Sequence, residues 1–294
     1  MSKLVGILYH PRLPEALTLS EALKERLQQL QYEVWTASAW AEQSATHLMP
    51  TTSAVVTIGG DGTILRAARA LVPNAIPILG IRYGRLGFLA EISPENALDQ
   101  VPLLLEKEQA PISRAMLQAT CDPIVLNALF TKEHHPLLTD EPQLNALNDV
   151  VIARGAVGRP ITIAVAIDGQ PLTNYRADAV ILSTATGSTG YVLAAGGPIL
   201  HPTSSAIVLM PVSAHATLDN PMVLEPEAVV ELTVRGDQGA FMSIDGQVDL
   251  PLPDGATVTV RRSPYQARFL HNGTPDQFYS QLLTRLRFGE VLDP

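Results

Sequence analysis

Lysine and cysteine are scarce in this chain of 294 residues. Only four lysines occur, with none between positions 25 and 106 and none after position 132. A P-loop requires Gly-x-x-x-x-Gly-Lys-Ser/Thr, whose lysine reaches the nucleotide phosphates, and the chain contains no such string. A P-loop NTPase is therefore excluded. The single cysteine, Cys121, excludes an internal disulfide and a zinc site built on cysteines, and it favours a reducing, cytoplasmic location.

Basic residues are outnumbered, and long apolar runs are missing. Twenty Lys and Arg face 29 Asp and Glu, a net charge of −9, which argues against nucleic acid or an anionic membrane as the main partner. Residues 179–218 carry no charge, but Gly, Ser, Thr and Pro interrupt them too often for a membrane span. The N-terminal apolar run ends at His10-Pro11, too early for a signal sequence.

The first third of the chain alternates between strand and helix patterns. With 46% hydrophobic residues the chain can bury a sizeable core, and its length favours two domains. Strands separated by helices imply a parallel sheet with right-handed crossovers. We therefore predict a Rossmann-like parallel α/β domain over residues 1–110. The apolar patterns behind it are strands at 4–9, 32–36, 54–58 and 76–81, and helices at 16–30 and 63–71.

After about residue 110 the pattern becomes β-rich. Short apolar runs alternate with Gly and Pro turns, and Asp168-Gly169 between two such runs is typical of a hairpin. We predict a β-rich, β-sandwich-like domain over residues 111–273, with residues 122–147 as an irregular or inserted loop. A last helix at 274–287 lies in a segment, 274–294, that we expect to return to and complete the first domain. The predicted strands are 161–167, 178–182, 206–210, 229–234, 241–244 and 257–260.

The sharpest local signal is Gly59-Gly60-Asp61-Gly62-Thr63. It follows a predicted strand and precedes a predicted helix, which is where open α/β sheets bind ligands. The glycines let several backbone N–H groups approach a phosphate, and the helix N-terminus adds partial positive charge. A carboxylate among such amides would repel a phosphate, so Asp61 makes sense if it accepts a proton from a hydroxyl or holds a metal. Alternatively, it only caps the helix.

Together with this segment, several later segments of the chain resemble motifs of the NAD kinase family and follow one another in the same order. The family shares the glycine signature with diacylglycerol kinases and phosphofructokinases. One such segment is a moderate signal, whereas an ordered series across residues 55–247 is a strong one. The matching segments are 59–63 (GGDGT), 84–89 (GRLGFL), 146–152 (ALNDVVI), 175–178 (YRAD), 183–191 (STATGSTGY), 196–199 (GGPI), 201–202 (HP) and 243–247 (SIDGQ).

The resemblance implies an activity. Members of the family transfer the terminal phosphate of ATP, or in some cases of polyphosphate, to the 2′-hydroxyl of the adenosine ribose of NAD, which makes NADP. They require a divalent cation, usually Mg²⁺, and commonly form homodimers or homotetramers. Phosphoryl transfer depends on positioning and charge neutralisation more than on covalent chemistry, so a glycine loop, a cation and one carboxylate suffice.

The resemblance also implies a role for each matching residue. Asp61 is expected to be the general base that acts on the 2′-hydroxyl, while no metal ligand is assigned. The other expected NAD-site residues are Gly60 and Gly62 for phosphate, Phe88 for the adenine, Asn148 and Asp149 for the ribose hydroxyls, Arg176 and Asp178, Thr186, Thr189, Gly190 and Tyr191 for the rest of the dinucleotide, and Asp245 in a supporting position.

Some positions depart from the family pattern. Asp149 stands where the family normally has Glu, and Arg82-Tyr83 replaces the usual Asn-Thr. These changes put substrate preference in doubt, including NAD against NADH. Two other functions remain open: a lipid kinase with the same glycine signature, and a nucleotide-binding protein with little catalysis. The later segments argue against the first, and the intact Asp61 argues against the second.

Overall fold

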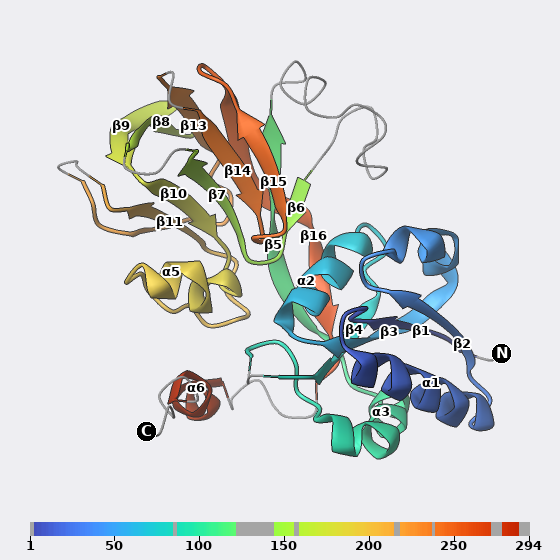
Figure 1. The fold of residues 1–294 in the computed structure, drawn as a ribbon. Helices are drawn as coiled ribbons and strands as arrows, with labels where there is room; N and C mark the ends of the chain where they lie inside the picture. Colours follow the sequence, from blue (N-terminus) through green and yellow to red (C-terminus); the bar gives the residue numbers. More distant parts are fainter. Residues whose placement is uncertain are drawn as a thin grey trace. The chain divides into compact units, whose positions relative to one another are not determined.

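A computed structural model describes residues 3–84, 87–121, 144–155, 159–214, 218–236, 239–271 and 278–287 of the chain. Its contacts divide it into two compact units. Unit 1 comprises Met1–Ser113 and Tyr265–Pro294, and unit 2 comprises Arg114–Pro264 (Figure 1). Among the described helices, none is long and apolar enough to cross a membrane.

Unit 1 is built on a parallel sheet. Its strand order is β2-β1-β3-β4, and the end of β16 pairs in parallel with β4, at Arg268 with Pro77 and Phe269 with Ile78. The elements are β1 (Leu4–Tyr9), α1 (Pro14–Gln29), β2 (Glu33–Ser38), η1 (Glu42–Thr51), β3 (Thr52–Gly59), α2 (Asp61–Ala70), β4 (Pro77–Arg82), η2 (Pro94–Asn96), α3 (Ala97–Glu106), the end of β16 (Thr257–Phe269) and α6 (Phe278–Arg287).

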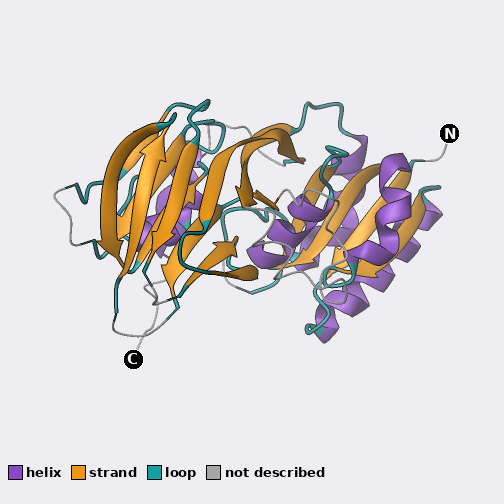
Figure 2. Ribbon diagram, turned by 90° about the horizontal axis from the view of Figure 1, so that it is seen from above, coloured by secondary structure: helices purple, strands orange, loops and turns teal. Residues whose placement is uncertain are grey.

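Helices cover both faces of this sheet (Figures 1 and 2). Helix α1 begins with Pro14 at its first turn and buries an apolar stripe spaced by three and four residues, from Ala16 to Leu27. This stripe packs with α3 and one face of the strands in a single apolar cluster. Helix α2 covers the other face, where Ile64 lies so close to Gly80 that a Cβ there would meet it at 2.8 Å. Because both faces are buried, the strands are apolar along most of their length.

Unit 2 is a β-sandwich. One layer is an antiparallel sheet in the order β12-β11-β10-β7-β14-β15, and the other contains β16, β13, β8 and β9. Buried residues of both layers form one core that includes the fully buried Tyr175. The elements are β5 (Ile112–Cys121), β6 (Leu144–Ala146), β7 (Asp149–Arg154), β8 (Ile161–Ile167), β9 (Gln170–Ala177), β10 (Ala179–Ser183), η3 (Gly187–Thr189), α5 (Tyr191–Ala194), β11 (Ile207–Val212), β12 (Met222–Leu224), β13 (Val230–Arg235), β14 (Ala240–Ile244), β15 (Val248–Leu252) and the first part of β16.

The predicted fold class, a parallel α/β sheet followed by a β-rich domain, is confirmed. The predicted hairpin is also present: Asp168 and Gly169 both have positive φ, 50° and 74°, as a two-residue type I′ turn requires.

Several local features differ from the prediction. Residues 144–146 were expected to be irregular, but they form β6 because they pair with Leu117–Ala119 of β5, a contact that only the tertiary fold creates. The rest of that predicted loop, residues 122–143, lies outside the described residues. Strand β16 extends past residue 260 to Phe269, and α3 and β5 were not predicted. The start of the last predicted helix, before Phe278, also lies outside the described residues.

Candidate functional site

The glycine-rich segment lies at the switch point of the parallel sheet. From β1 the chain crosses to β2 on one side and then to β3 on the other, so the strand order reverses between β1 and β3. Ligands of open α/β sheets bind outside the carboxyl ends of the strands at this point. Strand β3 ends at Gly59, Gly60 is the extended residue before the helix, and α2 begins at Asp61.

The segment packs closely on its own helix. A Cβ at Gly59 would lie 2.2 Å from the hydroxyl of Thr63, a side chain that is 1% exposed, so only glycine fits there. Within the described part of the chain, that hydroxyl has no hydrogen-bond partner. Gly60 is half-buried and Gly62 is exposed, which leaves their backbone accessible beside the helix N-terminus. This arrangement suits an anion.

The N-cap of α2 is Gly60, which has no side chain to cap the helix, and Asp61 is the first helical residue. Its carboxylate accepts the backbone N–H of Phe88 at 2.8 Å and that of Leu89 at 3.4 Å. A Cβ at Gly87 would lie 2.2 Å from both carboxylate oxygens, so the segment 87–89 lies directly against Asp61. Asp61 thus joins two motifs that are 27 residues apart in the sequence. Its role is therefore more than capping the helix.

Helix α6 contributes a cation that the sequence did not point to. Arg285 Nη1 donates a hydrogen bond to the carbonyl of Phe88 at 2.8 Å, and its guanidinium carbon lies 5.9 Å from the centroid of the Phe88 ring. Burial lowers the pKa of Arg285, the carboxylates of Glu91 and Asp61 oppose that shift, and Arg82 adds to it. A half-buried cation therefore lies in the field of Asp61.

In unit 2, Asp245 binds the backbone of the segment 147–149. Its carboxylate accepts the amides of Leu147 at 3.1 Å, Asn148 at 2.7 Å and Asp149 at 3.2 Å, and its own amide donates to the carbonyl of Asp149. Asp245 is 7% exposed and has a positive φ of 53°. It lies in the turn between β14 and β15, and its side chain also anchors a neighbouring loop.

The carbonyl groups of the same segment accept hydrogen bonds from Thr184. The hydroxyl of Thr184 donates to the carbonyl of Leu147 at 2.6 Å, while its amide donates to the carbonyl of Asn148 at 2.9 Å. A Cβ at Gly187 would lie 2.2 Å from that second carbonyl, so this position must be glycine. Backbone groups of residues 147–149 are thus hydrogen-bonded through both their amides and their carbonyls.

Asp149 is the first residue of β7 and is 6% exposed. Burial, and then repulsion from Asp245, raise its pKa from the ordinary value of 3.8 to about 7. With a pKa of about 7, Asp149 stays protonated over a wider pH range than an exposed aspartate does.

This raised pKa has a consequence for stability. Between pH 4 and 7 the folded chain binds the proton of Asp149 more tightly than the unfolded chain, so this residue makes the free energy of unfolding fall as pH rises. Asp149→Asn cannot ionise. Between pH 5 and 8 its free energy of unfolding should therefore rise relative to that of the wild type, by up to about 1.4 kcal/mol for each unit by which folding raises the pKa of Asp149. Denaturant unfolding at several pH values measures this, and a difference that stays constant with pH would contradict it.

The remaining predicted residues lie along unit 2. Thr186 is buried and its hydroxyl lies 3.5 Å from Arg114 Nη1, and Gly190 lies beside the Asn148 side chain. Tyr191 is 43% exposed at the start of α5, and Thr189 ends η3 just before it. Asp178 forms an ion pair with Arg154 at 3.0 Å. Arg176 is exposed on β9, where it alternates with buried Tyr175 and Ala177.

Most of the predicted residues form two groups, one in each unit, whereas Arg176 and Asp178 precede β10, at the end of that strand opposite to Ser183, and belong to neither. Gly60, Asp61, Gly62 and Phe88 come together in unit 1. In unit 2, Asn148, Asp149 and Asp245 come together with the 183–190 segment. Residues that sequence reasoning missed are Arg285, Thr184, Ser183 and Arg114; the first lies 197 positions after its partner Phe88, so no local pattern could have pointed to it.

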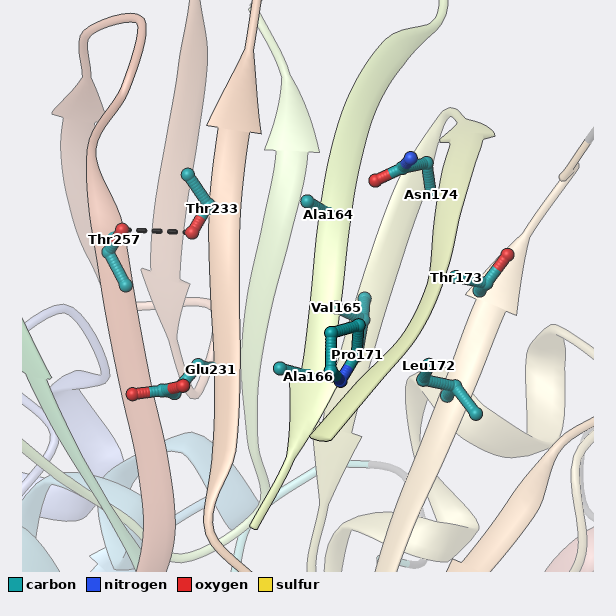
Figure 3. A pocket seen from close by; sticks show the side chains of 10 residues that line it. All are labelled: Ala164, Val165, Ala166, Pro171, Leu172, Thr173, Asn174, Glu231, Thr233 and Thr257. Carbon is teal, nitrogen blue, oxygen red and sulfur yellow. Dashed lines mark hydrogen bonds between the residues drawn. The ribbon is translucent and has the colours of Figure 1, made fainter. Parts of the chain in front are cut away.

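A hollow of about 460 Å³ lies elsewhere on unit 2, over strands β8, β9, β13 and β16. Figure 3 shows that its floor is formed by small or short side chains such as Ala164 and Ala166, and that Thr233 and Thr257 hydrogen bond beside it. None of the predicted site residues lines it, so it is separate from the groups described above.

The fold and these groups define a two-unit nucleotide-binding enzyme, in which an α/β unit with a glycine-rich switch-point loop is joined to a β-sandwich. The comparisons agree. The ATP-NAD kinase N-terminal domain matches residues 5–109, and the ATP-NAD kinase C-terminal domain matches residues 147–272. The chain belongs to this family and is a kinase.

Individual relatives cover nearly the whole chain. It is 39% identical to an NAD kinase of Dehalococcoides mccartyi, over 98% of this chain and 97% of that protein. It resembles the crystal structure of an NAD kinase from Archaeoglobus fulgidus in complex with ATP, with 26% identity, a TM-score of 0.73 and coverage of 97% and 99%. It shares its fold with yeast NADH kinase complexed with NADH, at 22% identity and a TM-score of 0.77, over 99% and 89% of the two chains.

Proposed function

We propose that this protein transfers the terminal phosphate of ATP to the 2′-hydroxyl of the adenosine ribose of NAD, which makes NADP. The observation that supports this best is the Asp61 carboxylate, held at the switch point beside the glycine-rich loop by the amides of Phe88 and Leu89. The relatives support the substrates, since one is named NAD kinase and another was solved in complex with ATP.

In this proposal the 2′-oxygen attacks the γ-phosphorus of ATP, the bond from that phosphorus to the bridging oxygen breaks, and ADP leaves. Asp61 takes the proton that the hydroxyl loses. The amides around Gly60 and Gly62 and the N-terminus of α2 hold phosphate charge without any lysine. Phe88, whose ring is half-buried, packs against the adenine.

Unit 2 supplies the remaining NAD contacts. Asn148 and Asp149 hydrogen bond to the ribose hydroxyls, and Arg176, Asp178, Thr186, Thr189, Gly190 and Tyr191 line the rest of the dinucleotide site. Since Asp149 is shorter by one methylene than the family's usual Glu, its hold on the ribose is altered. Asp245 supports these contacts from behind, because its carboxylate already binds three backbone amides.

We include a divalent cation, most simply Mg²⁺, in the proposed reaction. Within the described ranges no group of three His, Cys, Asp or Glu side chains could hold a metal by itself. In phosphoryl transfer Mg²⁺ is held mainly by the substrate phosphates and water, with one or two carboxylates, so it does not need three protein ligands. The cation would neutralise charge on the phosphates. Polyphosphate as donor, a homodimer or homotetramer, and a cytoplasmic location stay predictions.

The direct test is to incubate the purified protein with ATP, Mg²⁺ and NAD, and to measure NADP with an NADP-specific dehydrogenase. We expect NADP and ADP in equal amounts. Parallel reactions with NADH and with polyphosphate decide the acceptor and the donor, and a diacylglycerol substrate tests the lipid-kinase alternative. Absence of phosphorylated dinucleotide with every pair of donor and acceptor would refute the proposal.

A further inference from the structure

One half-buried cation of unit 1, Arg285, has no role in the function proposed above. Arg285 comes from the last described helix, and its guanidinium contacts Phe88, which also contacts Asp61. The peptide N–H of Phe88 donates to Asp61, and the carbonyl of the same residue accepts from Arg285. Phe88 is therefore held at both polar groups of its backbone, with the carboxylate at one and the guanidinium at the other.

The contact with Arg285 restricts where this loop can lie. The segment 87–89 already lies directly against Asp61, since a Cβ added at Gly87 would be 2.2 Å from the carboxylate oxygens. The hydrogen bonds from Phe88 and Leu89 to Asp61 oppose movement in the other direction, and the second of these is long at 3.4 Å. The hydrogen bond from Arg285, together with its position over the Phe88 ring, holds the loop from its carbonyl side.

The charges around Arg285 also favour a guanidinium held at this position. Glu91 and Asp61 stabilise its charged form, and Arg82 opposes it. Placing a guanidinium in a half-buried position costs free energy, which a hydrogen bond to a carbonyl and two nearby carboxylates offset.

We propose that Arg285 is a positioning residue for the phosphoryl transfer: it holds the segment 87–89 so that the Asp61 carboxylate faces the acceptor hydroxyl. This inference rests on the proposed role of Asp61. It gives the C-terminal helix α6 a part in a reaction whose other unit 1 groups come from residues 59–89. Misplacing a reacting group by about 1 Å can cost about 100-fold in rate.

The test compares Arg285→Ala, Arg285→Lys and the control Arg26→Ala, which removes an exposed arginine of α1 in the same unit. Turnover and the KM for NAD are measured with and without added guanidinium ion, and exchange of the Phe88 and Leu89 amides is followed by NMR. We expect Arg285→Ala to lose about 100-fold in kcat, to exchange those amides faster and to recover partly with guanidinium. Arg285→Lys keeps a hydrogen-bond donor, so its kcat and amide exchange should lie between those of the wild type and of Arg285→Ala.

The outcomes separate the proposals. If Arg285→Ala matches Arg26→Ala in both kcat and amide exchange, the inference is wrong. If kcat falls while the two amides keep their protection, Arg285 acts on the substrate directly and the positioning role is overturned. If the wild type makes no NADP, the proposed function fails, yet faster amide exchange in Arg285→Ala would still establish that Arg285 holds the loop.

Discussion

Replacing Asp61 with asparagine should lower kcat by about 100- to 10,000-fold, the range that general base catalysis contributes, and should leave NAD binding within a few-fold of the wild type. The reason is that asparagine keeps the size of the side chain and one acceptor oxygen but cannot take a proton. Its oxygen can still accept the 2.8 Å hydrogen bond from Phe88, so the loop it anchors should remain in place.

A second variant at the same position separates the base from the anchor. Asp61→Ala removes both the proton acceptor and the hydrogen bonds to residues 88 and 89, so it should expose those amides to exchange as well as lower kcat. Asp99→Asn, at an exposed position of α3, is the control and should retain wild-type activity. The measurements are kcat from NADP formation, the Kd for NAD by calorimetry, and amide exchange by NMR. If Asp61→Asn keeps the wild-type kcat, Asp61 is not the general base and only anchors the segment 87–89.

Much of unit 1 could be predicted from local patterns. The stripe from Ala16 to Leu27 predicted α1, and the short apolar runs predicted the parallel strands, because helix and strand periods are visible within a few residues. The segment 59–63 could be placed at the switch point for the same reason: a strand, three glycines and a helix follow one another along the chain.

The contacts that tie these motifs together could not be predicted. Asp61 binds the amide of a residue 27 positions away, Asp245 binds amides 96 to 98 positions before it, and Arg285 binds a carbonyl 197 positions before it. Each depends on where tertiary folding places two loops, and residue type alone does not encode the partner. Asp245 was expected in a supporting position, but the sequence did not reveal that its partners would be backbone amides.

The second large effect should come from Asp245. Asp245→Ala removes the acceptor of three amides, those of Leu147, Asn148 and Asp149, and a buried donor left without a partner costs about 1–3 kcal/mol. We expect a loss of at least about 3 kcal/mol in the free energy of unfolding at pH 5. Asp249→Ala, which removes one exposed hydrogen bond to Ser243 on the neighbouring strand, should cost less than about 1.5 kcal/mol.

The cost of removing Asp245 should depend on pH, and this dependence identifies its charge as part of the effect. Above pH 7 the wild-type Asp149 is ionised and repels Asp245, so the wild type already carries a penalty that Asp245→Ala relieves. At pH 5 Asp149 is protonated and there is no such relief. The destabilisation should therefore be smaller at pH 8 than at pH 5. Chemical denaturation at both pH values measures it; an equal cost at the two would mean that Asp245 acts through its hydrogen bonds alone.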